Sequence, residues 1–121
     1  MIFHPTELGG AWVIEPKRHA DERGFFARTF APEEFAARGL DPRVAQCAVA
    51  FNRQRGTLRG LHYQAAPHGQ AKLVRCTQGT IWDVVVDLRR DRPPNGASRR
   101  SSCPPTTGCN CTSRRASRTA I

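Results

Sequence analysis

The stretch Gly56-Thr57-Leu58-Arg59-Gly60-Leu61-His62-Tyr63-Gln64 mixes strand-forming apolar residues with glycine, a cation and a histidine. Short segments of similar character lie on both sides of it, separated by Gly, Pro and charged turns. This pattern is typical of an antiparallel β-sandwich or barrel. It predicts strands at residues 24–30, 44–51, 57–64, 70–77 and 80–88, with a tight turn at Gln78-Gly79 joining the last two.

One short helix interrupts this all-β pattern at residues 32–38. Pro32 stands at its start, Glu33 and Glu34 lie in its first turn, and Gly39 follows as a stop signal. Proline is tolerated in the first turn of a helix, and acidic side chains there favour the helix dipole. We therefore expect a single small domain, because 121 residues leave no room for a second one.

The net charge of +9 raises the possibility of a nucleic-acid or membrane-surface partner. However, five of the 19 basic residues and none of the 10 acidic ones lie beyond residue 98. The remaining positive charge is modest and suits an anionic substrate. No apolar run approaches the roughly 20 residues that span a bilayer. We therefore predict no nucleic-acid or membrane partner and, because the N-terminus does not look like a signal peptide, a cytoplasmic location.

Several motifs together resemble one known family, the dTDP-4-dehydrorhamnose 3,5-epimerases, which are cupin-type sugar-nucleotide enzymes. The resemblance covers residues 1–98 and implies an incomplete cupin-type jelly-roll β-barrel or sandwich. It also implies a dTDP-linked 4-keto sugar as partner, dTDP-rhamnose biosynthesis as the setting, and a homodimer for the intact family member. The motifs are Asp21-Glu22-Arg23-Gly24-Phe25-Phe26, Gln46-Cys47, residues 59–64, Lys72-Leu73-Val74-Arg75, and residues 83–89.

Cupins that bind metal carry a His-x-His pair followed by Glu. Here His62 is present, but Gln64 and Gln70 stand where the second His and the Glu would be. One remaining ligand cannot hold a divalent metal. We therefore expect an enzyme with neither metal nor cofactor.

Inverting a carbon next to a ketone requires a base, stabilisation of the enolate, and return of a proton from the opposite face. The resemblance implies that His62 is the base at C3 and C5 of the sugar and that Lys72 stabilises the enolate oxygen. It implies substrate contacts for a further set of residues: Arg59, Arg23, Phe26 and Gln46. Asp83 is a candidate to orient Lys72 or His62.

Alternatives stay open for each of these residues. Asp83 and Asp87 suit strand-edge charges equally well, and His62, Lys72 and the arginines have ordinary structural roles open to them. Arg59 and His62, three apart, would face opposite ways on a regular strand, which predicts a bulge at Gly60. Two rival functions remain: a non-catalytic sugar-nucleotide-binding cupin or decayed remnant, and an epimerase acting at C3 or C5 alone.

Residues 99–121 form a tail rich in Ser, Thr, Arg, Pro and Cys, which we expect to be disordered. A permitted set of codons for residues 101–120, read one base earlier, gives V-E-L-S-A-D-N-R-L-Q-L-Y-I-P-E-G-F-A-H-G. This product resembles the family's continuation, so the tail is interpreted as out of frame. The family's opposite-face Tyr and a late Asp that partners the base are missing, and we expect little activity from this chain.

Overall fold

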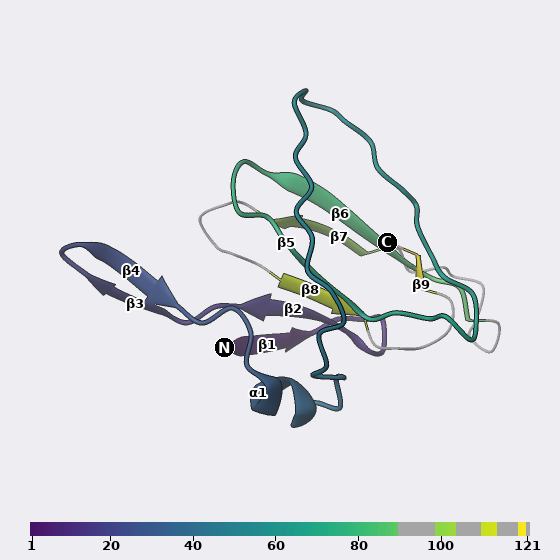
Figure 1. The fold of residues 1–121 in the computed structure, drawn as a ribbon, viewed down its shortest axis with the longest axis horizontal. Helices are drawn as coiled ribbons and strands as arrows, with labels where there is room; N and C mark the ends of the chain where they lie inside the picture. The colour runs from purple at the N-terminus through teal and green to yellow at the C-terminus, as the bar shows by residue number, and fades with distance from the viewer. Residues whose placement is uncertain (90–98, 104–109, 114–118, 121) are drawn as a thin grey trace.

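A computed structural model of the chain describes residues 1–89, 99–103, 110–113 and 119–120. Regular structure in these residues is almost entirely strand, with one short helix, α1 (Pro32–Ala36) (Figure 1). The strands are β1 (Ile2–Pro5), β2 (Ala11–Glu15), β3 (Arg18–Asp21), β4 (Gly24–Ala27), β5 (Lys72–Arg75), β6 (Ile81–Asp87), β7 (Arg99–Cys103), β8 (Asn110–Ser113) and β9 (Thr119–Ala120). The all-β class is confirmed.

Two layers of strands make up the body of the molecule. The first is a four-stranded sheet in the order β1-β2-β8-β5, and the second has the order β7-β6-β9. Every pairing in them is antiparallel. A separate two-stranded hairpin, β3-β4, projects to one side of the body in Figure 1. No closed barrel forms within the described residues.

Alternation along β2 explains why both of its faces are covered. Ile14 is fully buried on one face and packs with Phe35 of α1 and Leu40. Ala11 is on the other face, where it packs with Leu8 and with Val85 of β6. The first cluster holds the helix against the sheet, and the second joins the two layers.

Elements with strong local signals are confirmed. The predicted helix is α1, and the strands expected at residues 24–30, 70–77 and 80–88 are β4, β5 and β6, each shorter than expected. Gly79 adopts φ 77° in the predicted turn, a left-handed backbone suited to glycine. However, β5 and β6 lie in different sheets, so this turn carries the chain between layers instead of closing a hairpin.

The strands predicted at residues 44–51 and 57–64 are wrong. The structure has no strand between α1 and β5. Residues 42–71, here called the arm, instead run out from the body and return, with nearly every residue exposed (Figure 1). Apolar residues favour a strand only when a neighbouring strand completes the backbone hydrogen bonds. No strand in the described residues pairs with the arm.

Residues 99–103, 110–113 and 119–120 of the tail that we expect to be disordered are placed as the strands β7, β8 and β9. β8 pairs with β2 on one side and β5 on the other. Composition predicts whether side chains can form a core, whereas a strand ladder needs only backbone N–H and C=O groups, which every residue but proline supplies. The rest of the tail lies outside the described residues.

The helix found in the described residues is neither long nor apolar enough to cross a membrane.

Candidate functional site

Lys72 and Asp83 face one another across the space between the two sheets. Lys72 and Ala11 both have Ser113 of β8 as their register partner, so they lie in one row on the same face of the sheet. Ala11 packs with Val85 of β6, and Asp83 shares a face of β6 with Val85. Lys72 therefore points at the face of β6 that carries Asp83.

Burial raises the pKa of the Asp83 carboxyl above its ordinary value, because desolvation disfavours the charged form. A hydrogen bond from the backbone of Val84 and the charge of Lys72 both pull the pKa the other way. The raised pKa shows that desolvation outweighs these two effects. The Lys72 ammonium and the Asp83 carboxylate are thus an electrostatically coupled pair in a partly desolvated setting.

Replacing Asp83 by Asn is expected to stabilise the fold at neutral pH. Because the pKa is raised in the folded state, ionisation of Asp83 opposes folding. This penalty is absent below the unfolded value of 3.8 and is fully present above the folded pKa. Urea denaturation should show that Asp83→Asn raises the free energy of unfolding at neutral pH by less than about 1 kcal/mol, because the carboxyl is partly exposed and solvent screens it.

At a pH below 3.8 the same substitution should have no effect, since the carboxyl is then protonated in both states. Asp87→Asn is the matched control. Asp87 lies on the same face of β6 but is ion-paired with Arg89, so its loss should destabilise the fold. An equal gain from Asp83→Asn at both pH values would show that charge is not the cause.

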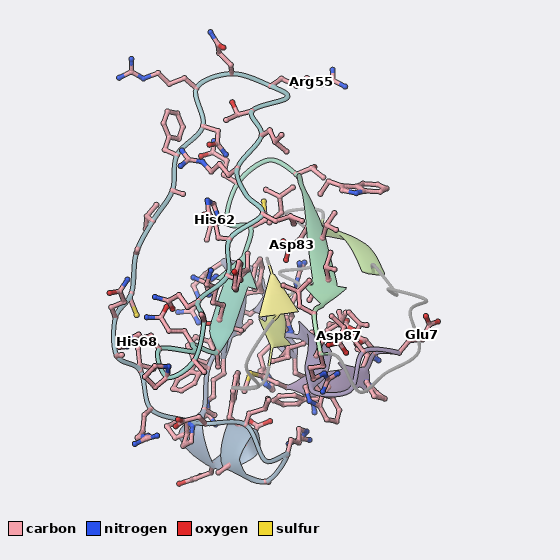
Figure 2. The ribbon with its side chains drawn as sticks, turned by 90° about the vertical axis from the view of Figure 1, so that its right-hand side faces the viewer. Glu7, Arg55, His62, His68, Asp83 and Asp87 are labelled. Atoms are coloured by element: carbon pink, nitrogen blue, oxygen red, sulfur yellow. The ribbon has the colours of Figure 1, made fainter. Side chains whose placement is uncertain are left out.

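His62, Arg59 and Gln46 lie on the arm, and all three are exposed. In Figure 2 His62 lies on the arm's returning limb, at the level of Asp83 in that view, while Arg55 marks the arm's tip. Within the described part of the chain, no hydrogen bond or ion pair joins His62 to Lys72. The structure therefore brings Lys72 and Asp83 together but leaves the other predicted site residues on separate segments.

Arg59 is held within the arm itself. Its Nε donates to Oδ1 of Asn52 at 2.7 Å, and its Nη2 donates to the carbonyl oxygen of Phe51 at 3.3 Å. These bonds join the outgoing and returning limbs. The predicted bulge at Gly60 is wrong because no strand ladder exists here, although Gly60 adopts a left-handed backbone with φ 108°.

Arg23 and Phe26 lie on the projecting β3-β4 hairpin. Phe26 is 70% exposed. The Arg23 guanidinium forms an ion pair with Asp21, with 2.6 Å between Nη2 and Oδ2, and the hydrogen bonds from Arg23 hold the pKa of Asp21 below its ordinary value. The hairpin thus presents an oriented guanidinium and an exposed aromatic ring outside the body of the molecule.

The sequence analysis did not predict the two side chains that orient Arg23 and Arg59, which are Asp21 and Asn52. Asp21 had a local signal, because the spacing Asp-x-Arg also occurs at Asp41 with Arg43 and is ion-paired there too. Asn52 had none, since it lies seven positions before Arg59. No group of three or more His, Cys, Asp or Glu that could hold a metal ion was found among the described residues.

Comparison with known proteins identifies relatives of this chain. The family model for dTDP-4-dehydrorhamnose 3,5-epimerase matches residues 5–101. A protein of that name from Methanothermobacter thermautotrophicus is 45% identical over 94 residues, covering 78% of this chain and 50% of the relative. A dTDP-4-dehydro-6-deoxyglucose 3-epimerase from Streptomyces bikiniensis is 47% identical over 95 residues, covering 78% of this chain and 48% of the relative.

Solved structures show the same likeness. A Bacillus anthracis dTDP-4-dehydrorhamnose 3,5-epimerase with TDP and PPi bound has a TM-score of 0.89 at 30% identity, covering 98% of this chain and 67% of that one. A 3'-monoepimerase from Streptomyces bikiniensis in complex with dTDP-quinovose has a TM-score of 0.85 at 37% identity, covering 97% and 58%. The chain spans about half the length of the curated relatives it matches. It belongs to the dTDP-4-dehydrorhamnose 3,5-epimerase family.

Proposed function

We propose that the intact form of this protein epimerises a dTDP-linked 4-keto-6-deoxy sugar at C3 and C5, yielding dTDP-4-dehydrorhamnose. The observation that carries the proposal is the Lys72–Asp83 pair between the two sheets. An ammonium group in a partly desolvated space stabilises an enolate oxygen far better than one in water. The match to the family, at up to 47% identity in these comparisons, supports the same reaction class.

In this mechanism His62 removes the proton next to the ketone, because a neutral imidazole is an effective base near pH 7. Negative charge then develops on the ketone oxygen, where Lys72 stabilises it. Asp83 orients the Lys72 ammonium without touching the substrate. Inversion is complete when an acid on the opposite face of the sugar returns a proton to the carbon, a role that the resemblance gives to a Tyr of the intact family member. Each step is a proton transfer, so the proposed chemistry needs no cofactor.

The charge of the arm supports an anionic substrate. Residues 42–71 include no Asp or Glu and four arginines. Arg43 pairs with Asp41, whereas Arg53, Arg55 and Arg59 have no carboxylate partner in the described part of the chain. Unneutralised guanidinium groups bind phosphate oxygens well because their planar N–H groups match that geometry. Arg59, Gln46, Arg23 and Phe26 are the proposed substrate contacts.

Calorimetric titration of the 121-residue chain with dTDP tests this assignment. We expect measurable binding of dTDP and much weaker binding of thymidine, because the diphosphate provides the charge that the arginines recognise. Equal affinity for the two compounds would contradict the proposed substrate contacts.

Two other functions are kept as candidates. An epimerase acting at C3 alone is favoured by the 47% identity to a relative described as a 3-epimerase. A non-catalytic binder is favoured by the exposed position of His62, which no hydrogen bond or ion pair among the described residues links to Lys72. Deuterium incorporation from heavy water distinguishes them: label at C3 and C5, at C3 only, or at neither position.

We also propose a homodimer and a cytoplasmic location for the intact protein. An isolated two-stranded hairpin is marginally stable in water. The β3-β4 hairpin nevertheless projects from the body with Phe25 and Phe26 at 61% and 70% exposure (Figure 1). A second copy of the chain that covers these rings would account for the projecting hairpin. Analytical ultracentrifugation is the test, and a species that stays monomeric at high micromolar concentration would contradict the dimer.

Finally, we propose that residues 99–121 are the next part of this enzyme translated in the wrong frame. Read one base earlier, the positions of β7 and β8 include V-E-L at 101–103 and Q-L-Y-I at 110–113. This supports the proposal, because β8 is paired on both sides and such strands favour apolar and aromatic residues. Resequencing the locus, together with mass spectrometry of tail peptides, distinguishes a real mutation from a sequencing error.

A further inference from the structure

Four arginines in the described residues donate an Nε hydrogen bond to a side-chain oxygen, and one of them differs from the rest. Arg23, Arg43 and Arg89 each donate to the Asp two residues earlier. Arg59 donates instead to a neutral amide, the Oδ1 of Asn52, at 2.7 Å. The position of Arg59 is therefore fixed without a negative charge.

The contacts of Arg59 lie on one edge of its guanidinium. Nε bonds to Asn52 and Nη2 bonds to the carbonyl oxygen of Phe51 at 3.3 Å. A guanidinium has five N–H donors in a rigid plane. With the Nε–Nη2 edge held, the Nη1 group keeps both donors for a ligand, in a direction that the arm determines.

The electrostatic consequence is the opposite for Arg23 and Arg59. Asp21 accepts hydrogen bonds from the Arg23 guanidinium and neutralises its charge. Asn52 accepts a hydrogen bond from Arg59 but, being neutral, does not neutralise the positive charge of the guanidinium. Arg59 also lies in an arm without acidic residues, so no carboxylate of its own segment competes with an incoming anion.

We propose that Asn52 is a positioning residue for Arg59, fixing one edge of the guanidinium while keeping its full charge available to the phosphate oxygens of a nucleoside diphosphate. The inference rests on the proposed function, since it specifies which arginine carries most of the charge recognition. It adds that the neutrality of Asn52, and not only its shape, matters for binding.

Two substitutions of Asn52 distinguish the positioning of Arg59 from the charge around it, one isosteric and one truncating. Asn52→Asp keeps an acceptor oxygen in place but adds a negative charge, whereas Asn52→Ala removes the acceptor. NMR of the ¹⁵N-labelled chain should show a slowly exchanging Arg59 Nε–H signal in the unaltered protein and in Asn52→Asp. The signal should be lost by exchange in Asn52→Ala. A signal that persists in Asn52→Ala would overturn the positioning role.

Titration with dTDP measures the charge effect. Asn52→Asp is expected to weaken dTDP binding roughly fivefold to tenfold at low salt, because a carboxylate then neutralises Arg59 near the ligand. The loss should shrink between about 50 mM and about 500 mM NaCl as ions screen the added charge. A purely structural role for Asn52 would not produce this salt dependence.

Thr57→Val is the matched control in the same loop. It removes the 2.8 Å hydrogen bond from Thr57 Oγ1 to the carbonyl oxygen of Gln54 and leaves the hydrogen-bonding groups of Arg59 and Asn52 unchanged. In the Thr57→Val protein, we expect the Arg59 Nε–H signal and the affinity for dTDP to equal those of the unaltered chain. Asn52→Asp binding dTDP as tightly as the unaltered chain would overturn the inference alone. Failure of the unaltered chain to bind dTDP would overturn the proposed function and the charge role of Asn52 with it.

Discussion

Inserting one base near codons 98–100 is expected to convert a chain with little activity into an efficient epimerase. The insertion restores the frame in which residues 101–120 read V-E-L-S-A-D-N-R-L-Q-L-Y-I-P-E-G-F-A-H-G and translation continues beyond them. We expect turnover of the 4-keto sugar nucleotide to rise by at least about a thousandfold, because a positioned acid or base alone contributes a factor of that order. An NMR assay of C3 and C5 inversion measures it.

The structure supplies a physical reason for this gain beyond the missing acid. The arm leaves large apolar side chains in water, with Val49 at 95% and Leu58 at 89% exposure. Restored strands that pair with the arm would bury these side chains and hold His62 in place. The restored protein should therefore also unfold at a higher temperature than the 121-residue chain.

An insertion of one base just beyond the codon for Arg118 is the control, because it also lets translation continue in the restored frame but leaves residues 99–118 out of frame. It should give no gain in turnover. A restored-frame protein that folds as a stable species and binds dTDP but shows no turnover would contradict the frame proposal as an account of lost activity.

Local features of the fold followed from the sequence, and features that need a distant partner did not. The helix α1 was predictable because Pro32, Glu33 and Gly39 mark its ends within a few residues. The arm was not, because a strand forms only against a neighbour, and no described strand lies against residues 44–51. The same limit made the tail's strands unpredictable, since its composition bears on burial and not on backbone pairing.

The candidate site shows the same division. The sequence made Asp83 a candidate partner of Lys72 or of His62, but which of the two it approaches depends on the register of β5 with β8 and of β8 with β2. No spacing in the sequence encodes that register. Conversely, Arg59 and His62 are close in sequence, but no strand forms there, so the two-residue period of a strand could not predict their directions.

Substituting His62 or Lys72 in the restored-frame enzyme is expected to abolish most turnover, but at different steps. His62→Asn removes the base while keeping a polar side chain, and should lower kcat by about 10²–10⁴-fold. It should also eliminate deuterium exchange at C3 and C5, because no group then takes the proton. Affinity for dTDP should remain, since the proposed role of the imidazole is at the sugar, which dTDP lacks.

Lys72→Met keeps the length of the side chain but removes the charge that we propose stabilises the enolate, so kcat should fall by roughly 10²–10³-fold. Asp83 then loses its electrostatic partner, and its pKa should rise further, because the Lys72 charge now acts to lower it. NMR titration of the Asp83 carboxyl in the Lys72→Met protein measures that change independently of turnover. Lost turnover with an unchanged Asp83 pKa would show that the two side chains are not coupled, and that Asp83 orients something other than Lys72.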